Sequence, residues 1–194
     1  SIPSGVLVSR FATGRDVREY GSGKSGFTNT LRLAGIGAAL VVVSVDIMKG
    51  AIPVLIGLFV FDDPWAVTAG AITAVAGHNW PLFAGFRGGR GVATSFGAFV
   101  AMVPLVALIV LVLGLLLLAA TRYVSLTSMT ATAVGSFSIL VLVFMDRLPD
   151  PYLIFAIGVA VAVELSHLGN ARRLLAGTEP KLGDGGAPRT GLRS

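Results

Sequence analysis

Residues 20–29, YGSGKSGFTN, form a short glycine-rich loop that could bind an anion. Its three glycines would let backbone N–H groups converge on a phosphate, and a helix N-terminus is expected to follow. Lys24 adds a positive charge, while Ser22, Thr28 and Asn29 can form side-chain hydrogen bonds. The letters GKS end a Walker A motif, but that motif needs a glycine where this chain has Arg18. We therefore interpret the loop as a phosphate site that is not for nucleotides; a flexible loop before a helix cap is the alternative.

A second glycine-rich segment, FRGGRG at 86–91, places Arg87 and Arg90 on either side of two glycines. Guanidinium groups bind phosphate oxygens through paired hydrogen bonds. His78 precedes this segment, and Thr94 lies where the next helix should begin. An ordinary basic loop of a membrane protein is the alternative. Similar RGG sequences occur in RNA-binding proteins, but six residues between apolar stretches are a poor platform for RNA, so we expect no nucleic-acid partner.

A third polar cluster lies in HLGNARRLLAGTEPKLG at 167–183. His167 and Asn170 are three residues apart and would share a helix face, and Glu179 follows them. Neither His167 nor His78 is followed five positions later by Asp, so the His-x4-Asp pair of acyltransferases that consume acyl thioesters is absent. No spacing typical of metal ligands occurs, and we expect neither a metal nor a cofactor.

Three further charged residues, Asp46, Lys49 and Glu164, lie within apolar stretches. Charges inside a membrane are candidates for functional sites. A structural ion pair near a kink at Gly50 and Pro53 explains Asp46 and Lys49 equally well, and Glu164 allows the same two interpretations.

Membrane helices must position these polar segments. The 194 residues are 54% hydrophobic and only 13% charged, with a mean hydropathy of +0.83, whereas soluble domains carry about 25% charged residues. The alternation of polar and apolar residues found in membrane β-barrels does not occur. We predict an all-α polytopic membrane protein, in which residues 1–12 are the end of a truncated first span.

The apolar stretch 92–120 decides the topology. As one helix it would be roughly 43 Å long, whereas the hydrocarbon core of a bilayer is about 30 Å thick. Pro104 predicts a break within it. A turn there gives about seven spans and places most basic residues on one side, which favours the N-terminus outside and the C-terminus in the cytoplasm. The other spans are expected at 32–61, 65–83, 124–145 and 152–168, and the three polar segments would then meet at the cytoplasmic face.

Several sequence patterns, taken in order, match those of one family. They are SIPSG at 1–5, GSGKSGFTN at 21–29 followed by Arg32, GHNWP at 77–81, FRGGRGVAT at 86–94, RYVSLTS at 122–128 and the third cluster at 167–183. Together they cover nearly the whole chain, which resembles the bacterial acyl-phosphate:glycerol-3-phosphate acyltransferase family of the PlsY type. The departures from the family pattern are Lys24, Ser25, Phe27, Trp80 and arginine in place of lysine at 87 and 90.

The resemblance implies an enzyme that moves an acyl group from acyl phosphate to sn-glycerol 3-phosphate, giving 1-acyl-glycerol 3-phosphate (lysophosphatidic acid) and phosphate. This is the first acylation of phospholipid biosynthesis. It also implies a multi-pass protein of the bacterial inner membrane, a site facing the cytoplasm and a soluble enzyme that supplies the acyl phosphate. The base would be the substrate's own phosphate or His167. A transporter of phosphate-bearing anions and an enzyme using acyl-CoA or acyl-carrier protein are the alternatives.

Matching motif by motif gives the candidate site residues. The catalytic candidates are Ser22, His167 and Asn170. The candidates for binding the substrates and their phosphates are Gly21, Ser22, Gly23, Lys24, Gly26, Thr28, Asn29, Arg32, His78, Arg87, Gly88, Gly89, Arg90, Gly91, Thr94 and Glu179. Residues 1–183 would form a single transmembrane acyltransferase domain, and 184–194 a flexible basic tail.

Overall fold

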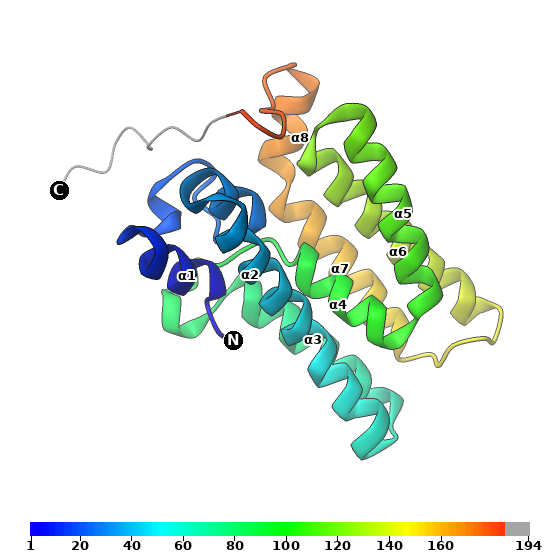
Figure 1. Ribbon diagram of the computed structural model, residues 1–194. Helices are drawn as coiled ribbons and strands as arrows, with labels where there is room; N and C mark the ends of the chain where they lie inside the picture. Colours follow the sequence, from blue (N-terminus) through cyan, green and yellow to red (C-terminus); the bar gives the residue numbers. More distant parts are fainter. Residues whose placement is uncertain (185–194) are drawn as a thin grey trace.

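The computed structural model describes residues 1–184, and every regular element in that range is helical (Figure 1). The helices are α1 (Ser4–Thr13), α2 (Phe27–Ile56), α3 (Pro64–Asn79), α4 (Val92–Met102), α5 (Pro104–Thr121), α6 (Val124–Phe144), α7 (Tyr152–Ser166) and α8 (Leu168–Leu175). Short turns are η1 (Val17–Glu19), the π-helical η2 (Gly57–Phe61) and η3 (Leu82–Ala84). The prediction of an all-α protein is confirmed. Of the tail expected at 184–194, all but Asp184 lies outside the described residues.

The apolar stretch at 92–120 is broken where Pro104 predicted it. Val103 has the non-helical angles φ −144° and ψ 73°, and Pro104 begins α5. Proline suits the first position of a helix, where its missing N–H would have had no partner. Phe99 of α4 and Val110 of α5 both lie against Gly135 of α6, so the chain reverses its direction at the break (Figure 1).

The first polar loop is shorter than the expected 13–31, because α2 begins at Phe27. Thr28 and Asn29 therefore lie on the first turn of a helix. Within α2, Gly35 has φ 81° and ψ 179°, a conformation that only glycine adopts at low cost. The kink at Gly35 separates the first two turns of α2 from its long apolar part, so the polar end of the helix takes its own direction.

Helices α2 and α4 approach each other closely through two glycines. A Cβ atom added at Gly50 would lie 1.9 Å from the carbonyl oxygen of Thr94, and one at Gly97 would lie 2.0 Å from that of Ile47. Small residues at such crossings let helix backbones pack closely within a membrane, where hydrophobic exclusion from water supplies no driving force. This contact fixes α4, which carries one side of the site, against α2.

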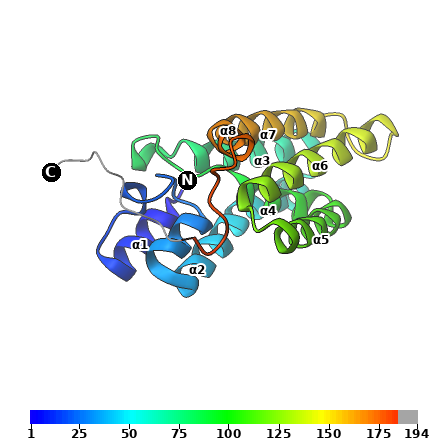
Figure 2. The same cartoon turned by 90° about the horizontal axis from the view of Figure 1, so that it is seen from above.

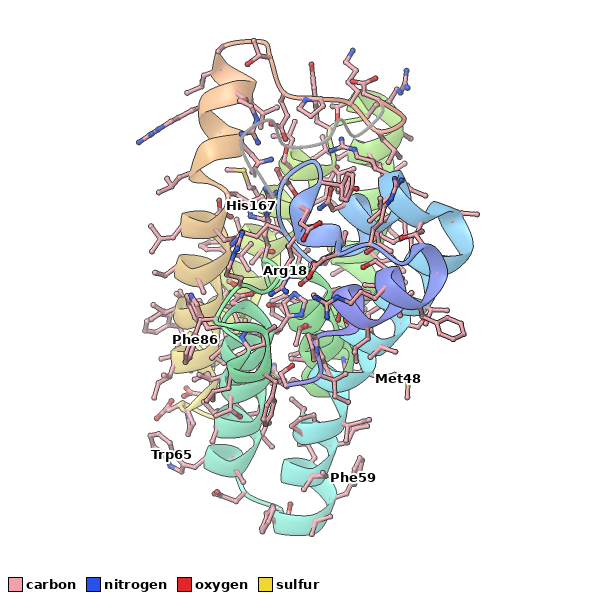
Figure 3. The ribbon with its side chains drawn as sticks, turned by 90° about the vertical axis from the view of Figure 1, so that its left-hand side faces the viewer. Arg18, Met48, Phe59, Trp65, Phe86 and His167 are labelled. Carbon is pink, nitrogen blue, oxygen red and sulfur yellow. The ribbon has the colours of Figure 1, made fainter. Side chains whose placement is uncertain are left out.

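The outer surface is rich in exposed apolar side chains, as expected for a protein surrounded by lipid. Met48 of α2, Phe59 of η2 and Trp65 of α3 point outward (Figure 3). By length and composition, three helical segments could cross a membrane: Phe27–Phe61, Pro104–Thr121 and Val124–Phe144. A fourth would be α7 with α8, which are bent by 55° at their junction. Because α1, α3 and α4 have 10, 16 and 11 residues, the count of seven spans and their orientation stay predictions.

We predict that Gly97→Ala destabilises the protein. Its new methyl group would collide with the backbone of α2, which cannot rotate away, at a cost of about 1–3 kcal/mol. Thermal unfolding of the purified protein in detergent should show a lower midpoint. Gly158→Ala on α7 is the matched control, because its Cβ would meet nothing within 4 Å. Equal midpoints for the two variants would contradict the close packing of α2 and α4.

Candidate active site

A cavity of about 820 Å³ lies at the end of the molecule where α2, α4, α6 and α8 begin and where α5 and α7 end. Candidates from all three polar segments line it: Gly21, Ser22, Lys24, Gly26, Thr28, Asn29, Arg32, His78, Arg90, Gly91, His167, Asn170 and Glu179. The candidates that do not line it are Gly23, Arg87, Gly88, Gly89 and Thr94. The structure thus brings together segments that are far apart in the sequence, while the role of each residue stays a prediction.

Asn29 holds the first loop in shape. Its side-chain amide donates hydrogen bonds to the carbonyl oxygens of Val17, Tyr20 and Lys24, at 2.8, 2.9 and 2.9 Å. Asn29 is buried, and Gly21 packs so closely on its Oδ1 atom that a Cβ there would lie 2.4 Å away. The observed contacts of Asn29 are therefore within the protein, and they set the positions of Ser22 and Lys24 at the cavity.

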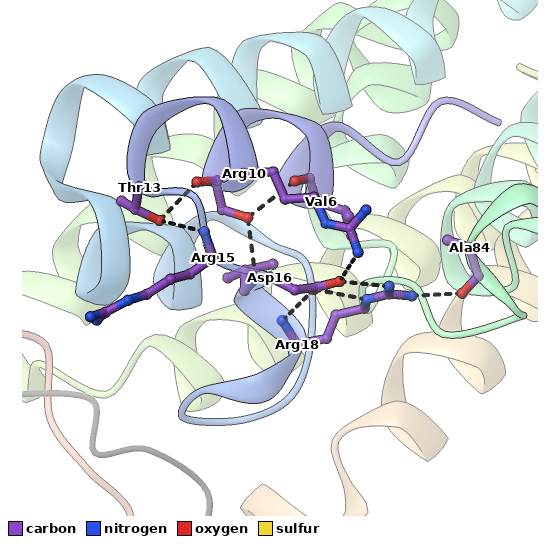
Figure 4. Close-up of polar contacts among 9 residues, drawn as sticks. Val6, Arg10, Thr13, Arg15, Asp16, Arg18 and Ala84 are labelled. Atoms are coloured by element: carbon purple, nitrogen blue, oxygen red, sulfur yellow. Dashed lines mark hydrogen bonds and ion pairs between the residues drawn. The ribbon is translucent and has the colours of Figure 1, made fainter. Parts of the chain in front are cut away.

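Asp16 ties the first loop to the second. Its carboxylate accepts hydrogen bonds from Arg10 at 3.0 Å and from Arg18 at 2.7 and 3.0 Å (Figure 4). Arg18 in turn donates to the carbonyl oxygen of Ala84 at 2.7 Å, across to η3. The hydrogen bond from the Arg18 side chain is the largest cause that lowers the pKa of Asp16, to about 2. Asp16 is thus ionised at neutral pH and holds both loops in register.

The glycine pair of the second loop docks on the end of α3. The N–H groups of Gly88 and Gly89 donate to the carbonyl oxygens of Asn79 and His78, both at 3.2 Å. A Cβ at Gly88 would lie 2.0 Å from the carbonyl oxygen of His78, and one at Gly89 would lie 1.9 Å from Nε2 of its ring. These glycines serve close packing, so their N–H groups point into the protein. Arg87, just before them, is exposed.

Arg90 is the most confined cation of the cavity. Its Nε atom is buried and has no hydrogen-bond partner within residues 1–184. Burial lowers its pKa most; Glu179 favours its charge, whereas Arg173 and Arg32 oppose it. A guanidinium remains protonated even so, because its ordinary pKa is above 12. Because Lys24, Arg32, Arg90 and Arg173 line the cavity and its only lining carboxylates within residues 1–184 are Asp46 and Glu179, the site holds an excess of positive charge, which favours an anionic ligand.

Glu179 organises the third segment. It accepts hydrogen bonds from Ser125 at 2.6 Å, Asn170 at 2.5 Å and Arg173 at 2.7 Å. Burial would raise the pKa of Glu179, but these three hydrogen bonds outweigh burial and lower it. Both carboxylate oxygens are thus engaged, and Glu179 fixes Asn170 and Arg173 at the cavity wall.

The chain after α8 crosses the end of the helices toward α2 (Figure 2). Two hydrogen bonds join Leu182 to Arg122. The N–H of Leu182 donates to the Arg122 carbonyl at 2.7 Å, and the Arg122 guanidinium donates to the Leu182 carbonyl at 2.8 Å. A smaller cavity of about 250 Å³ lies between this segment and Thr28 and Arg32. Residues 177–184 therefore form one wall of the site entrance.

His167 sits at the bend between α7 and α8, with 1% of its surface exposed. Its Nδ1 atom lies 2.8 Å from the carbonyl oxygen of Val163. A carbonyl oxygen can only accept, so Nδ1 carries the proton and, in the neutral ring, Nε2 has a free lone pair. His167 can thus accept a proton or a hydrogen bond from a substrate hydroxyl in the cavity.

Two of the three charged residues within apolar stretches, Asp46 and Lys49, form an ion pair, and Asp46 lies at the wall of the cavity. Lys49 Nζ lies 2.7 Å from Asp46 Oδ1, which also accepts a hydrogen bond from Ser4 at 2.5 Å. His78 Nδ1 lies 3.6 Å from the same oxygen. Asp46 therefore connects α1, α2 and the end of α3, which fits the structural interpretation. It also lines the cavity, which fits the functional interpretation.

Sequence reasoning did not assign any residue of α6 to the site, although α6 lines it with Ser125, Thr127 and Ser128. The available signal for these residues is the segment RYVSLTS. It matches the family pattern, but the match assigns no role to its hydroxyl groups. Arg173 was also left out, although it lines the cavity and pairs with Glu179. Serine and threonine are common in apolar membrane helices, so their presence in α6 does not by itself indicate a binding surface.

A family model described as glycerol-3-phosphate acyltransferase matches residues 1–177. The chain belongs to the glycerol-3-phosphate acyltransferase family. It is 43% identical to a glycerol-3-phosphate acyltransferase of Rubrobacter xylanophilus, over 94% of this chain and 89% of that protein. It is 45% identical to glycerol-3-phosphate acyltransferase 2 of Moorella thermoacetica, over 95% and 92%.

Two solved structures of PlsY (YgiH), an integral membrane glycerol 3-phosphate acyltransferase, share the fold. The glycerol 3-phosphate form is 37% identical, with a TM-score of 0.81 over 93% of this chain and 92% of that one. The lysophosphatidic acid form is 35% identical, with a TM-score of 0.77 over 92% and 91%. The present chain is thus a PlsY-type membrane acyltransferase, and these findings do not support the transporter alternative.

We predict that Asp16→Asn lowers the stability of the acyltransferase in a pH-dependent way. The folded-state pKa of about 2 lies below the ordinary value, so the carboxylate contributes stability above about pH 4 and loses it as the pH falls toward 2. At pH 7 the variant should lose about 1–2 kcal/mol, and this difference should shrink toward pH 3. Thermal unfolding at several pH values measures it, with the exposed Asp150→Asn as control. A pH-independent difference would contradict the assignment.

Proposed function

We propose that this acyltransferase takes its acyl group from an acyl phosphate and passes it to a hydroxyl of sn-glycerol 3-phosphate. The products are 1-acyl-glycerol 3-phosphate and inorganic phosphate. The observation that carries this proposal is the half-buried guanidinium of Arg90, whose buried Nε atom has no hydrogen-bond partner within residues 1–184, where the polar entrance of the cavity meets its apolar part. A donor with phosphate at one end and an acyl chain at the other fits that junction.

Two anionic substrates must lie close together in this reaction, and the cavity can offset their repulsion. Arg32, Arg90, Arg173 and Lys24 line it, and Glu179 is largely occupied by its own hydrogen bonds. The N-termini of α2 and α4 face the same space and add the positive end of each helix dipole. Fixed donors and charges of this kind stabilise charge that develops during acyl transfer.

The chemistry needs little from the protein beyond positioning, because an acyl phosphate is already an activated mixed anhydride. The glycerol hydroxyl oxygen attacks the acyl carbon, its proton passes to a base, and the bond from the acyl carbon to the phosphate oxygen breaks. The base is either the phosphate of the substrate or Nε2 of His167, whose lone pair is available as described above. Orienting both substrates supplies a large part of the rate enhancement.

In the cell, we place the protein in the bacterial inner membrane with the cavity facing the cytoplasm. The basic residues on the loops at the cavity end fit the positive-inside tendency. A soluble enzyme would then deliver acyl phosphate from the same side. Residues 1–183 act as one domain in this proposal.

The donor can be tested directly with the full-length protein in lipid nanodiscs. Labelled glycerol 3-phosphate is supplied with decanoyl phosphate, decanoyl-CoA, decanoyl-acyl-carrier protein or no donor. We expect labelled lysophosphatidic acid with the acyl phosphate alone. Product formed with a thioester donor, or none with any donor, would refute the proposed donor.

We predict that Arg90→Gln lowers the rate of acyl transfer by about 10²–10³-fold, because it removes a fixed charge from the developing phosphate. The loss should appear chiefly in kcat at saturating glycerol 3-phosphate. Arg147→Gln is the matched control, since Arg147 is exposed on the α6–α7 turn and outside the cavity. If both variants turned over at the wild-type rate, Arg90 would have no role in the reaction.

A further inference from the structure

The cavity continues from its polar entrance into an apolar arm between α2, α4, α5 and α6, to which α2 contributes Val43 and Ile47. On α4 the arm is lined successively by Val92, Phe96 and Phe99, and on α5, in the opposite direction, by residues from Leu118 to Val110. Residues one turn deeper, such as Met102 and Val106, are buried but do not line it. The arm therefore ends at the level of Phe99 and Val110.

The end of the arm is a rigid wall made by the ring of Phe99. This side chain is 1% exposed, and its ring meets that of Phe155 edge-on, at 5.6 Å between centroids and 69° between planes. Gly135 of α6 supports the ring from behind: a Cβ there would lie 2.9 Å from Cε2 of Phe99 and 3.2 Å from Cγ2 of Val110. The ring thus has no room to retreat when a chain reaches it.

The length of the arm limits how much of an acyl chain it can hold. From Gly91 to Phe99 the helix advances roughly 12 Å, at about 1.5 Å per residue. An extended alkyl chain advances roughly 1.25 Å per carbon, from the carbon–carbon bond length and tetrahedral angle. About ten carbons therefore fit between the entrance and the ring of Phe99.

We propose that Phe99, with Gly135 behind it, determines the acyl-chain length that this enzyme prefers. This inference rests on the proposed function, because the chain enters the arm only if the acyl donor binds in this cavity. Removing the ring extends the arm and favours longer chains. Adding a methyl group at Gly135 pushes the ring into the arm and favours shorter ones.

The test is a competition between decanoyl phosphate and lauroyl phosphate for limiting enzyme in nanodiscs, with the two lysophosphatidic acids measured by mass spectrometry. Phe99→Leu should raise the ratio of 12-carbon to 10-carbon product by roughly tenfold, in line with the selectivity that hydrophobic pockets reach for small changes in chain length. Phe99→Ala should raise it further. Gly135→Ala should lower it.

Phe137→Ala on α6 is the matched control, because Phe137 is 66% exposed and faces away from the cavity; its ratio should equal that of the wild type. Opposite shifts in Phe99→Leu and Gly135→Ala support the inference even if Phe99→Ala fails to fold. Active variants with an unchanged ratio would overturn it and would mean that the chain leaves the arm sideways into the bilayer. Inactivity of the wild type with both acyl phosphates would instead refute the proposed donor.

Discussion

Arg90, a half-buried cation whose buried Nε atom has no hydrogen-bond partner within the described residues, is the constraint on which the rest of the site depends. Removing a charge from water is costly unless other charges and hydrogen bonds compensate for it. Glu179 supplies part of that compensation, and it is itself held by Ser125, Asn170 and Arg173. Helices α4, α6 and α8 must therefore begin at one level, so that the carboxylate and the guanidinium lie near each other.

The remaining polar contacts hold the loops and the helix ends at the cavity in place. Asp16 and Arg18 connect the first loop to the second, and Asn29 gathers three carbonyl oxygens of the first loop. The close contacts at Gly50 and Gly97 then lock α4 against α2. These residues hold loops and helices in position and do not need to touch a substrate. Polar residues therefore outnumber the groups that the reaction itself requires.

The sequence allowed the break at Pro104 and the meeting of the three polar segments to be predicted, because proline and charge have local or strongly directional consequences. It did not reveal that α2 begins at Phe27, nor that Gly88 and Gly89 serve packing on His78. The packing of the two glycines depends on the loop that brings them back onto the end of α3, a contact that local sequence patterns do not show. The hydroxyl groups of α6 were missed for the same reason: Ser125 acquires meaning only when Glu179 lies 2.6 Å away.

With the proposed acyl phosphate donor, the lack of a conventional nucleophile and base pair has a physical explanation. A thioester donor needs a base that activates the hydroxyl, whereas an acyl phosphate brings its own activation and its own anionic oxygens. A site for such a donor must mainly hold two phosphates near each other and place a hydroxyl beside an acyl carbon. Confined cations, helix N-termini and one histidine with a free lone pair suit that need, and in the proposed reaction the apolar arm beneath them accommodates the acyl chain.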